Sequence, residues 1–377
     1  MRDDGARRDG LVPRPLPPIP AGCPLRARIL TYNPQGSTRL VNAFEAHLSP
    51  CADYFVFLPA LVADKTQPRS GTALASVHQR TGRFHAAAEF HYATWSQVTG
   101  MSWQEKGVEF RRRMAAAGYD LARGDTWAIN ELPTTVRHDA TVRAQVRALL
   151  RGLAAGPAGA PARTGIVYVV QLGHDTTNHA VYKPHLKDWL GDAAFWQDVN
   201  QTVESWGQET YVQPDRTCVA GTTVGEKSIR INEFAEHPAR LAQAGGAATA
   251  AARTFLNRAY FPLLTAVWRS TAYGQTNISL DAMKHLVSLE TYATRAWAGA
   301  NPYPDGRIGF AWDDAVDGAT EADVVELAER LALAVGEAYG LQGSAAKACS
   351  PSGAFTWCAC SVAGAAFNAT WATYESW

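Results

Sequence analysis

The chain alternates short apolar runs, typical of strands, with longer amphipathic segments, typical of helices. Such an alternation, kept up along most of the sequence, predicts a parallel β-sheet covered by helices. A length of 377 residues suits one large closed barrel. We therefore expect an α/β fold, a (β/α)8 TIM barrel with a small C-terminal appendage. The strand-like runs span residues 27–33, 54–59, 84–92, 124–133, 166–172, 207–212 and 307–312.

The strand that should come between residues 213 and 306 is not evident. Residues 233–270 and 279–298 have helical character, and residues 273–276 are the best substitute for the missing strand. A helix is predicted over 184–203, directly before the strand-like run at 207–212.

The two ends of the chain differ from the barrel in composition. Residues 1–24 are charged and then proline-rich, which predicts a disordered N-terminal arm. Residues 25–340 should form the barrel. Residues 341–377, rich in Gly, Ala and Ser with aromatic residues between them, should form the appendage packed on it.

Composition excludes several function classes. Lys+Arg and Asp+Glu both number 35, and this balance argues against a nucleic-acid partner. No apolar run reaches the roughly 18 residues of a membrane helix. No glycine-rich phosphate loop is present, so no nucleotide cofactor is expected. The histidines at 174, 179 and 185 do not have metal-ligand spacing, so no metal is expected either. The oligomeric state is left open.

The six cysteines favour an exported protein with one or two disulfides over reduced, buried thiols in a cytosolic one. We expect secretion, with the signal peptide removed from this chain because none is visible. The sequence does not specify the disulfide pairing.

The run 124–133 ends in Asn130 and Glu131 and is stopped by Pro133. A parallel barrel presents catalytic groups at the C-terminal tips of its strands. A glutamate buried on this Trp- and Ile-rich strand would favour its protonated form, as a general acid requires. The alternative is a strand-end carboxylate paired with an arginine such as Arg137.

Other polar and aromatic residues lie near the predicted strand tips, and all tips should meet at one mouth. Aromatic faces there would suit the apolar face of a sugar. We expect two catalytic carboxylates, Glu131 and Glu209. The predicted substrate-binding residues are Glu89, His91, Trp95, Trp127, Asn130, His174, Trp206, Tyr211 and Trp312.

The ending Ile129-Asn130-Glu131 resembles the acid/base motif of the TIM-barrel superfamily of retaining glycoside hydrolases, and Trp312 resembles its strand-eight tryptophan. The resemblance implies that Asn130 binds a sugar hydroxyl and that Glu131 protonates the leaving oxygen. The whole chain also resembles an uncharacterised exported actinobacterial family. The superfamily's nucleophile is a glutamate ending strand seven, and this sequence has no clear strand with that ending.

The second carboxylate therefore has alternatives, with Glu290 and Glu89 behind Glu209. A separation of about 5 Å between the two carboxyl groups would mean retention, and roughly 6.5–9.5 Å inversion. The predicted function is a secreted glycoside hydrolase cleaving an oligo- or polysaccharide, with retention implied by the resemblance. The alternative is a non-catalytic barrel that binds glycans or a protein.

Overall fold

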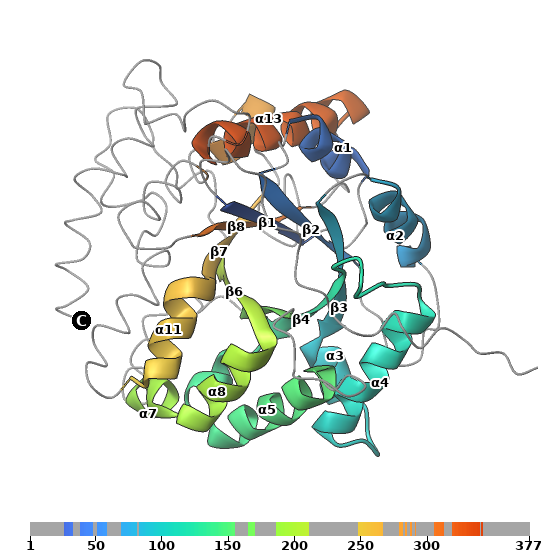
Figure 1. The fold of residues 1–377 in the computed structure, drawn as a ribbon. Coiled ribbons are helices and arrows are strands. Elements are labelled where there is room, and N and C mark those ends of the chain that lie inside the picture. The colour runs from blue at the N-terminus through green and yellow to red at the C-terminus, as the bar shows by residue number, and fades with distance from the viewer. Residues whose placement is uncertain are drawn as a thin grey trace, which may run out of the picture.

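The computed structural model describes residues 26–32, 38–47, 51–58, 69–80, 83–154, 165–169, 186–210, 248–266, parts of 279–291, 305–312, 319–339 and residue 341. Within these residues, parallel strands close a barrel in sequence order, with β1 pairing β8 (Figure 1). The predicted fold class is confirmed. The strands are β1 Arg26–Tyr32, β2 Ala52–Leu58, β3 Phe84–His91, β4 Thr126–Leu132, β5 Gly165–Val169, β6 Val203–Thr210, β7 Tyr260–Thr265 and β8 Asp305–Ala311.

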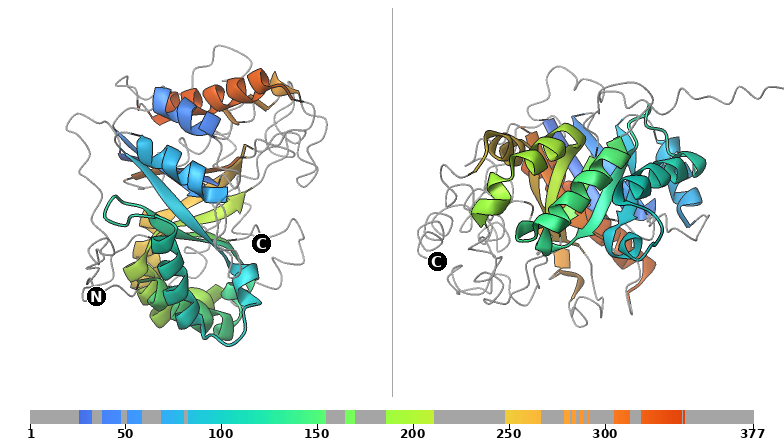
Figure 2. Two further views of the ribbon diagram at one scale, coloured as in Figure 1. Left: turned by 90° about the vertical axis from the view of Figure 1, so that its right-hand side faces the viewer. Right: turned by 90° about the horizontal axis from the view of Figure 1, so that it is seen from below.

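Helices surround the barrel and follow the strands in turn, as Figure 1 and the side views of Figure 2 show. The long last helix lies beside the first one, where Arg39 and Glu321 form an ion pair. The main helices are α1 Thr38–His47, α2 Arg69–Gln79, α3 Tyr92–Ser96, α4 Trp103–Ala116, α5 Ala140–Ala154, α7 Leu186–Gly191, α8 Ala193–Thr202, α11 Ala250–Ala259 and α13 Glu321–Tyr339, with a 3-10 turn η2 at Thr134–Arg137.

Local sequence sets several helix starts. Ser102 and Glu105 form a reciprocal capping box at the start of α4, with Ser102 N–H donating to Glu105 at 2.7 Å. Asp192 accepts from the backbone N–H of Phe195 at 3.0 Å and so separates α7 from α8. The single helix predicted over 184–203 is therefore wrong in two respects, because it is two helices and its last residue already belongs to β6.

The predicted seventh strand is also wrong. The observed β7, Tyr260–Thr265, lies inside the segment predicted as helical and pairs with both β6 and β8. Pro262 stands in the middle of this strand, opposite Gln208 of β6. A proline is rare inside a central strand because it cannot donate to the hydrogen-bond ladder, so the pattern did not indicate a strand.

Two apolar clusters divide the core. One fills the barrel interior, and the other lies between the strands and the helices. Because successive side chains of a strand point to opposite faces, membership of the interior cluster fixes which residues of each strand face inward. The interior cluster is Leu30, Phe55, Phe57, Ala87, Ala128, Ile166, Tyr168, Phe261 and Leu263.

The predicted N-terminal arm, residues 1–24, lies outside the described residues, as does the appendage beyond Leu341. Cys51 at the start of β2 is the one cysteine that the described residues include, so the pairing of the cysteines stays a prediction. No helix among the described residues is long and apolar enough to cross a membrane.

Candidate active site at the C-terminal end of the barrel

Glu131 has an unusual backbone conformation. Its φ of 54° makes it the one non-glycine residue in the described part of the chain with a positive φ. The register between β4 and β5 also shifts between Ile129 and Leu132, as at a β-bulge. A side chain in this left-handed region costs about 1 kcal/mol or more, and such strain and bulges cluster at functional sites. The end of β4 is therefore a candidate functional site on backbone grounds alone.

Because of the bulge, the Glu131 side chain does not follow the in-and-out alternation of side chains along a regular strand. Its side chain is 46% exposed, whereas its neighbours Asn130 and Leu132 are buried. The expectation that the strand buries Glu131 is wrong, because that expectation assumed a regular strand up to Pro133. The desolvation argument for a protonated carboxyl therefore has no support in the ligand-free protein.

His91, the last residue of β3, lies beside Glu131. Its Nε2 is 3.0 Å from Glu131 Oε2. Its Nδ1 accepts a hydrogen bond from the backbone N–H of Thr94 at 3.2 Å and so caps α3. In the neutral imidazole, an accepting Nδ1 assigns the proton to Nε2, which then donates to Glu131. The alternative partner, Arg137, instead stacks over the ring of Trp189 at 5.4 Å.

Glu89 and Asn130 form a buried polar pair on neighbouring strands. Asn130 Nδ2 donates to Glu89 Oε1 at 2.8 Å. Both residues face the barrel interior, because Ala87 and Ala128, two positions earlier, belong to the interior cluster. Glu89 is 3% exposed. A carboxylate buried to this degree needs a donor, and Asn130 provides one.

Glu209 of β6 is the third carboxylate at this end. A Cβ at Gly207 would lie 2.6 Å from Phe261 Cζ and 2.8 Å from Tyr168 Cδ1, which places Gly207 inside the barrel. Glu209, two residues on, therefore also faces inward, and it is 7% exposed. Tyr168 lies on the neighbouring strand β5. Burial and the nearby Glu209 charge both raise the pKa of the Tyr168 phenol.

The structure thus brings five of the predicted site residues to one end of the barrel interior and its rim, and Glu290 is not needed to form the group. These residues are Glu89, His91, Asn130, Glu131 and Glu209. Sequence reasoning missed Tyr168. The spacing from the inward-facing Ile166 would have placed it inside the barrel.

Four predicted substrate-binding tryptophans do not line this mouth. Each is 2% exposed or less and belongs to the cluster between barrel and helices. Trp95 stacks on Phe90 at 5.0 Å, and Trp206 packs against Trp196 at 5.6 Å. The prediction placed every aromatic residue near a strand tip at the mouth, but alternate side chains of a strand face outward. The four residues are Trp95, Trp127, Trp206 and Trp312.

His174, Tyr211 and the alternative carboxylate Glu290 lie outside the described residues. The end of β7 is described up to Thr265 and Ala266, and neither is a glutamate. The superfamily's strand-seven nucleophile therefore has no counterpart at these two positions.

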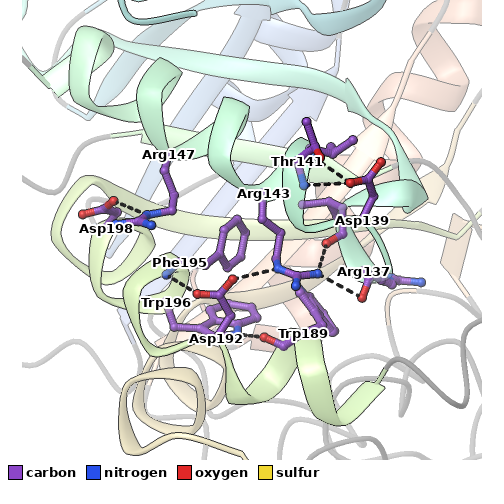
Figure 3. Close-up of polar contacts among 12 residues, drawn as sticks. Arg137, Asp139, Thr141, Arg143, Arg147, Trp189, Asp192, Phe195, Trp196 and Asp198 are labelled. Carbon is purple, nitrogen blue, oxygen red and sulfur yellow. Dashed lines mark hydrogen bonds and ion pairs between the residues drawn. The ribbon is translucent and has the colours of Figure 1, made fainter.

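The segment that follows Glu131 is tied down by a buried arginine on α5 (Figure 3). Arg143 Nε donates to Asp192 Oδ2 at 2.8 Å, and its Nη1 donates to the carbonyls of Val136 and Arg137 at 3.3 and 3.4 Å. Asp192 is at the same time the cap of α8. The backbone after β4 is thus fixed to two helices, which limits its freedom to relax the strained Glu131.

Among the described residues, no group of three His, Cys, Asp or Glu side chains is arranged to hold a metal ion. The chemistry open to the described site is that of carboxylates, one amide, one imidazole and one phenol.

No protein-family model matches the chain, and no curated protein matches it in sequence. Among solved structures, it is similar to the apo form of an endo-β-N-acetylglucosaminidase from Cordyceps militaris, with 13% identity and a TM-score of 0.42, over 82% of this chain and 91% of that one. It is also similar to a structure of the tandem GH20 catalytic modules of the pneumococcal exo-β-D-N-acetylglucosaminidase StrH, with 12% identity and a TM-score of 0.33, over 84% and 86%. Likenesses this weak carry no argument about the chemistry of this chain.

Proposed function

We propose that the protein is a glycoside hydrolase acting on an oligo- or polysaccharide. The observation that supports this most is the group of three carboxylates at the C-terminal end of the barrel, contributed by β3, β4 and β6. Glu89 and Glu209 are buried inside the barrel, whereas Glu131 stands at its rim. Hydrolysis of a glycosidic bond needs one carboxyl that gives a proton and one carboxylate that attacks or activates water.

Glu131 is our candidate for the general acid. Its exposed carboxyl is accessible to the leaving-group oxygen of a bound glycan, and His91 holds it by a 3.0 Å contact. A substrate lying across the rim would remove water from Glu131. Removal of water from a carboxyl favours its proton-carrying form.

Glu209 is our candidate for the ionised partner. Glu89 is the weaker choice because its carboxylate already accepts from Asn130, an arrangement that suits positioning of the amide. The amide of Asn130 keeps a second N–H and its carbonyl oxygen, which suits a sugar hydroxyl. Retention through a covalent intermediate and inversion through an activated water are both compatible with this assignment.

We further propose that the protein is secreted. The six cysteines support this, because an exported protein can hold them as disulfides. Disulfides persist in oxidising compartments outside the cytosol.

The test is release of reducing sugar from a broad panel of glycans by wild-type protein and by three glutamine variants. We expect Glu131→Gln and Glu209→Gln each to lower kcat by about 10²- to 10⁴-fold. Glu105→Gln is the control, since Glu105 is an exposed capping residue of α4 and is not one of the three strand-end carboxylates. Equal activity of Glu131→Gln and wild type would overturn the assignment of the acid.

The alternative is a non-catalytic barrel that binds glycans or a protein, and the exposure of Glu131 is the observation that favours it. Wild-type protein that binds members of the glycan panel and releases no sugar from any of them would establish this alternative.

A further inference from the structure

Tyr168 on β5 is enclosed inside the barrel. Its side chain is 0% exposed, and its ring meets Phe57 edge-on at 5.0 Å and Phe261 edge-on at 5.7 Å. Gly207 leaves the space that the ring occupies, because a Cβ there would lie 2.8 Å from Tyr168 Cδ1. These are contacts of the aromatic ring, and a phenylalanine would make all of them.

The Tyr168 hydroxyl is buried and has no hydrogen-bond partner among the residues that the structure describes. Leaving a buried hydroxyl without a partner costs free energy, so packing alone does not account for a tyrosine here. Tyr54 on β2 shows the usual arrangement. It is equally enclosed, and its hydroxyl lies 3.0 Å from Thr31 Oγ1. In the described part of the barrel interior, the Tyr168 phenol oxygen is thus available to a further partner.

Glu209 is the carboxylate beside this phenol. Tyr168 is opposite Gly207 in the register of β5 and β6, and Glu209 is the next inward position of β6 toward the mouth. The two groups interact electrostatically. The adjacent inward positions of β7 hold Phe261 and Leu263. The other ionisable side chains at this end of the described interior are Tyr32 on β1 and Glu89 and His91 on β3. Tyr168 is therefore the neutral donor placed next to Glu209.

We propose that Tyr168 is a positioning residue whose hydroxyl donates a hydrogen bond to the ionised carboxylate of Glu209 in the working enzyme. A donor to the charged form stabilises it, which is the requirement for a carboxylate that attacks or activates water. The inference rests on the proposed function, in which Glu209 is the ionised partner. The proposed hydrogen bond gives the Tyr168 hydroxyl a function, whereas packing in the apolar interior does not require a hydroxyl.

The test compares Tyr168→Phe with Tyr54→Phe in the full chain. The carboxyl titration of Glu209 is followed by ¹³C NMR on glutamate-labelled protein, and Glu209→Gln assigns the signal. We expect Tyr168→Phe to move the midpoint upward by roughly one pH unit and Tyr54→Phe to leave it in place.

An unchanged Glu209 midpoint in Tyr168→Phe would overturn the proposal. The titration needs no substrate, so its outcome is separate from that of the sugar-release test. If the midpoint shifts but the protein hydrolyses no glycan, the proposed Tyr168–Glu209 hydrogen bond stands and the proposed hydrolase activity is rejected.

Discussion

His91 Nε2 and Glu131 Oε2 lie 3.0 Å apart, across the ends of two neighbouring strands. The same imidazole caps α3 through Nδ1, which accepts from Thr94. One side chain therefore anchors both the helix that leaves β3 and the carboxyl that ends β4. The helix cap sets the ring's orientation and its tautomer, and the ring in turn orients the carboxyl.

The two roles of His91 can be separated by substitution. Asparagine is a good N-cap but is too short to reach Glu131, whereas alanine loses both contacts. We expect His91→Asn and His91→Ala to lose sugar-releasing activity alike, by about tenfold or more. Only His91→Ala should also lose stability, by about 1 kcal/mol in urea unfolding. Full activity in His91→Asn would show that the contact with Glu131 is not needed.

The backbone strain at Glu131 predicts a gain in stability when it is released. Glycine adopts a φ of 54° without penalty, whereas glutamine keeps the strain while removing the charge. We expect Glu131→Gly to be about 1 kcal/mol more stable than Glu131→Gln, with both variants inactive. Equal unfolding free energies for the two would mean that the left-handed conformation stores no strain.

Asp53 on β2 predicts a pH dependence of stability. Burial opposes its ionisation, but hydrogen bonds from His85 and from Arg83, at 2.7 Å, outweigh burial and hold its pKa below the usual value. A lowered folded-state pKa means stability that is complete above the unfolded value of about 3.9 and is lost as the pH falls through the folded value.

Asp53→Asn should therefore be destabilised by about 3 kcal/mol at pH 7, because it removes the buried carboxylate that pairs with Arg83. The gap between the variant and wild type should narrow as the pH falls below about 3.9, because the unfolded wild-type chain takes up a proton at Asp53 before the folded chain does. Urea unfolding at pH 7 and pH 3 measures both gaps. A gap of equal size at the two pH values contradicts the assignment.

Gly207 predicts a packing defect in the barrel interior. Alanine there would bring its Cβ to 2.6 Å from Phe261 Cζ, so Gly207→Ala should lose about 1–3 kcal/mol of unfolding free energy. Phe261→Leu removes the nearest of the clashing ring atoms, whereas the contact with Tyr168 Cδ1 at 2.8 Å remains. The double variant should therefore lose less than the sum of the two single losses, and strict additivity would locate the strain elsewhere.

Most of the barrel was predictable because most of the strand-like runs read as apolar in sequence and are buried in the structure. β7 was not, because Pro262 contradicts the usual composition of a central strand and only pairing with β6 and β8 makes it one. The prediction of a single helix over 184–203 was wrong because the role of one residue in it depends on the tertiary structure. Asp192 is compatible with a helix interior, but in the structure it caps α8.

The sequence was sufficient to choose the carboxylates of the candidate site, but not the aromatic residues that were expected to line it. Glu89, Glu131 and Glu209 were chosen because they lie in strand-like runs near the expected strand tips, and that rule needs only the direction of the chain. The tryptophans were chosen by the same rule and lie outside the barrel, because a rule of position along the chain ignores which face a residue takes.

The sequence by itself determined that alternating strands and helices close into a barrel, and that acidic residues stand at the strand ends. Tertiary structure decided which of those side chains face inward, because a one-residue difference in register moves a side chain from the interior to the helix layer. It also decided the left-handed turn at Glu131, since that conformation is unfavourable for the isolated peptide and persists only where the surrounding contacts outweigh its cost.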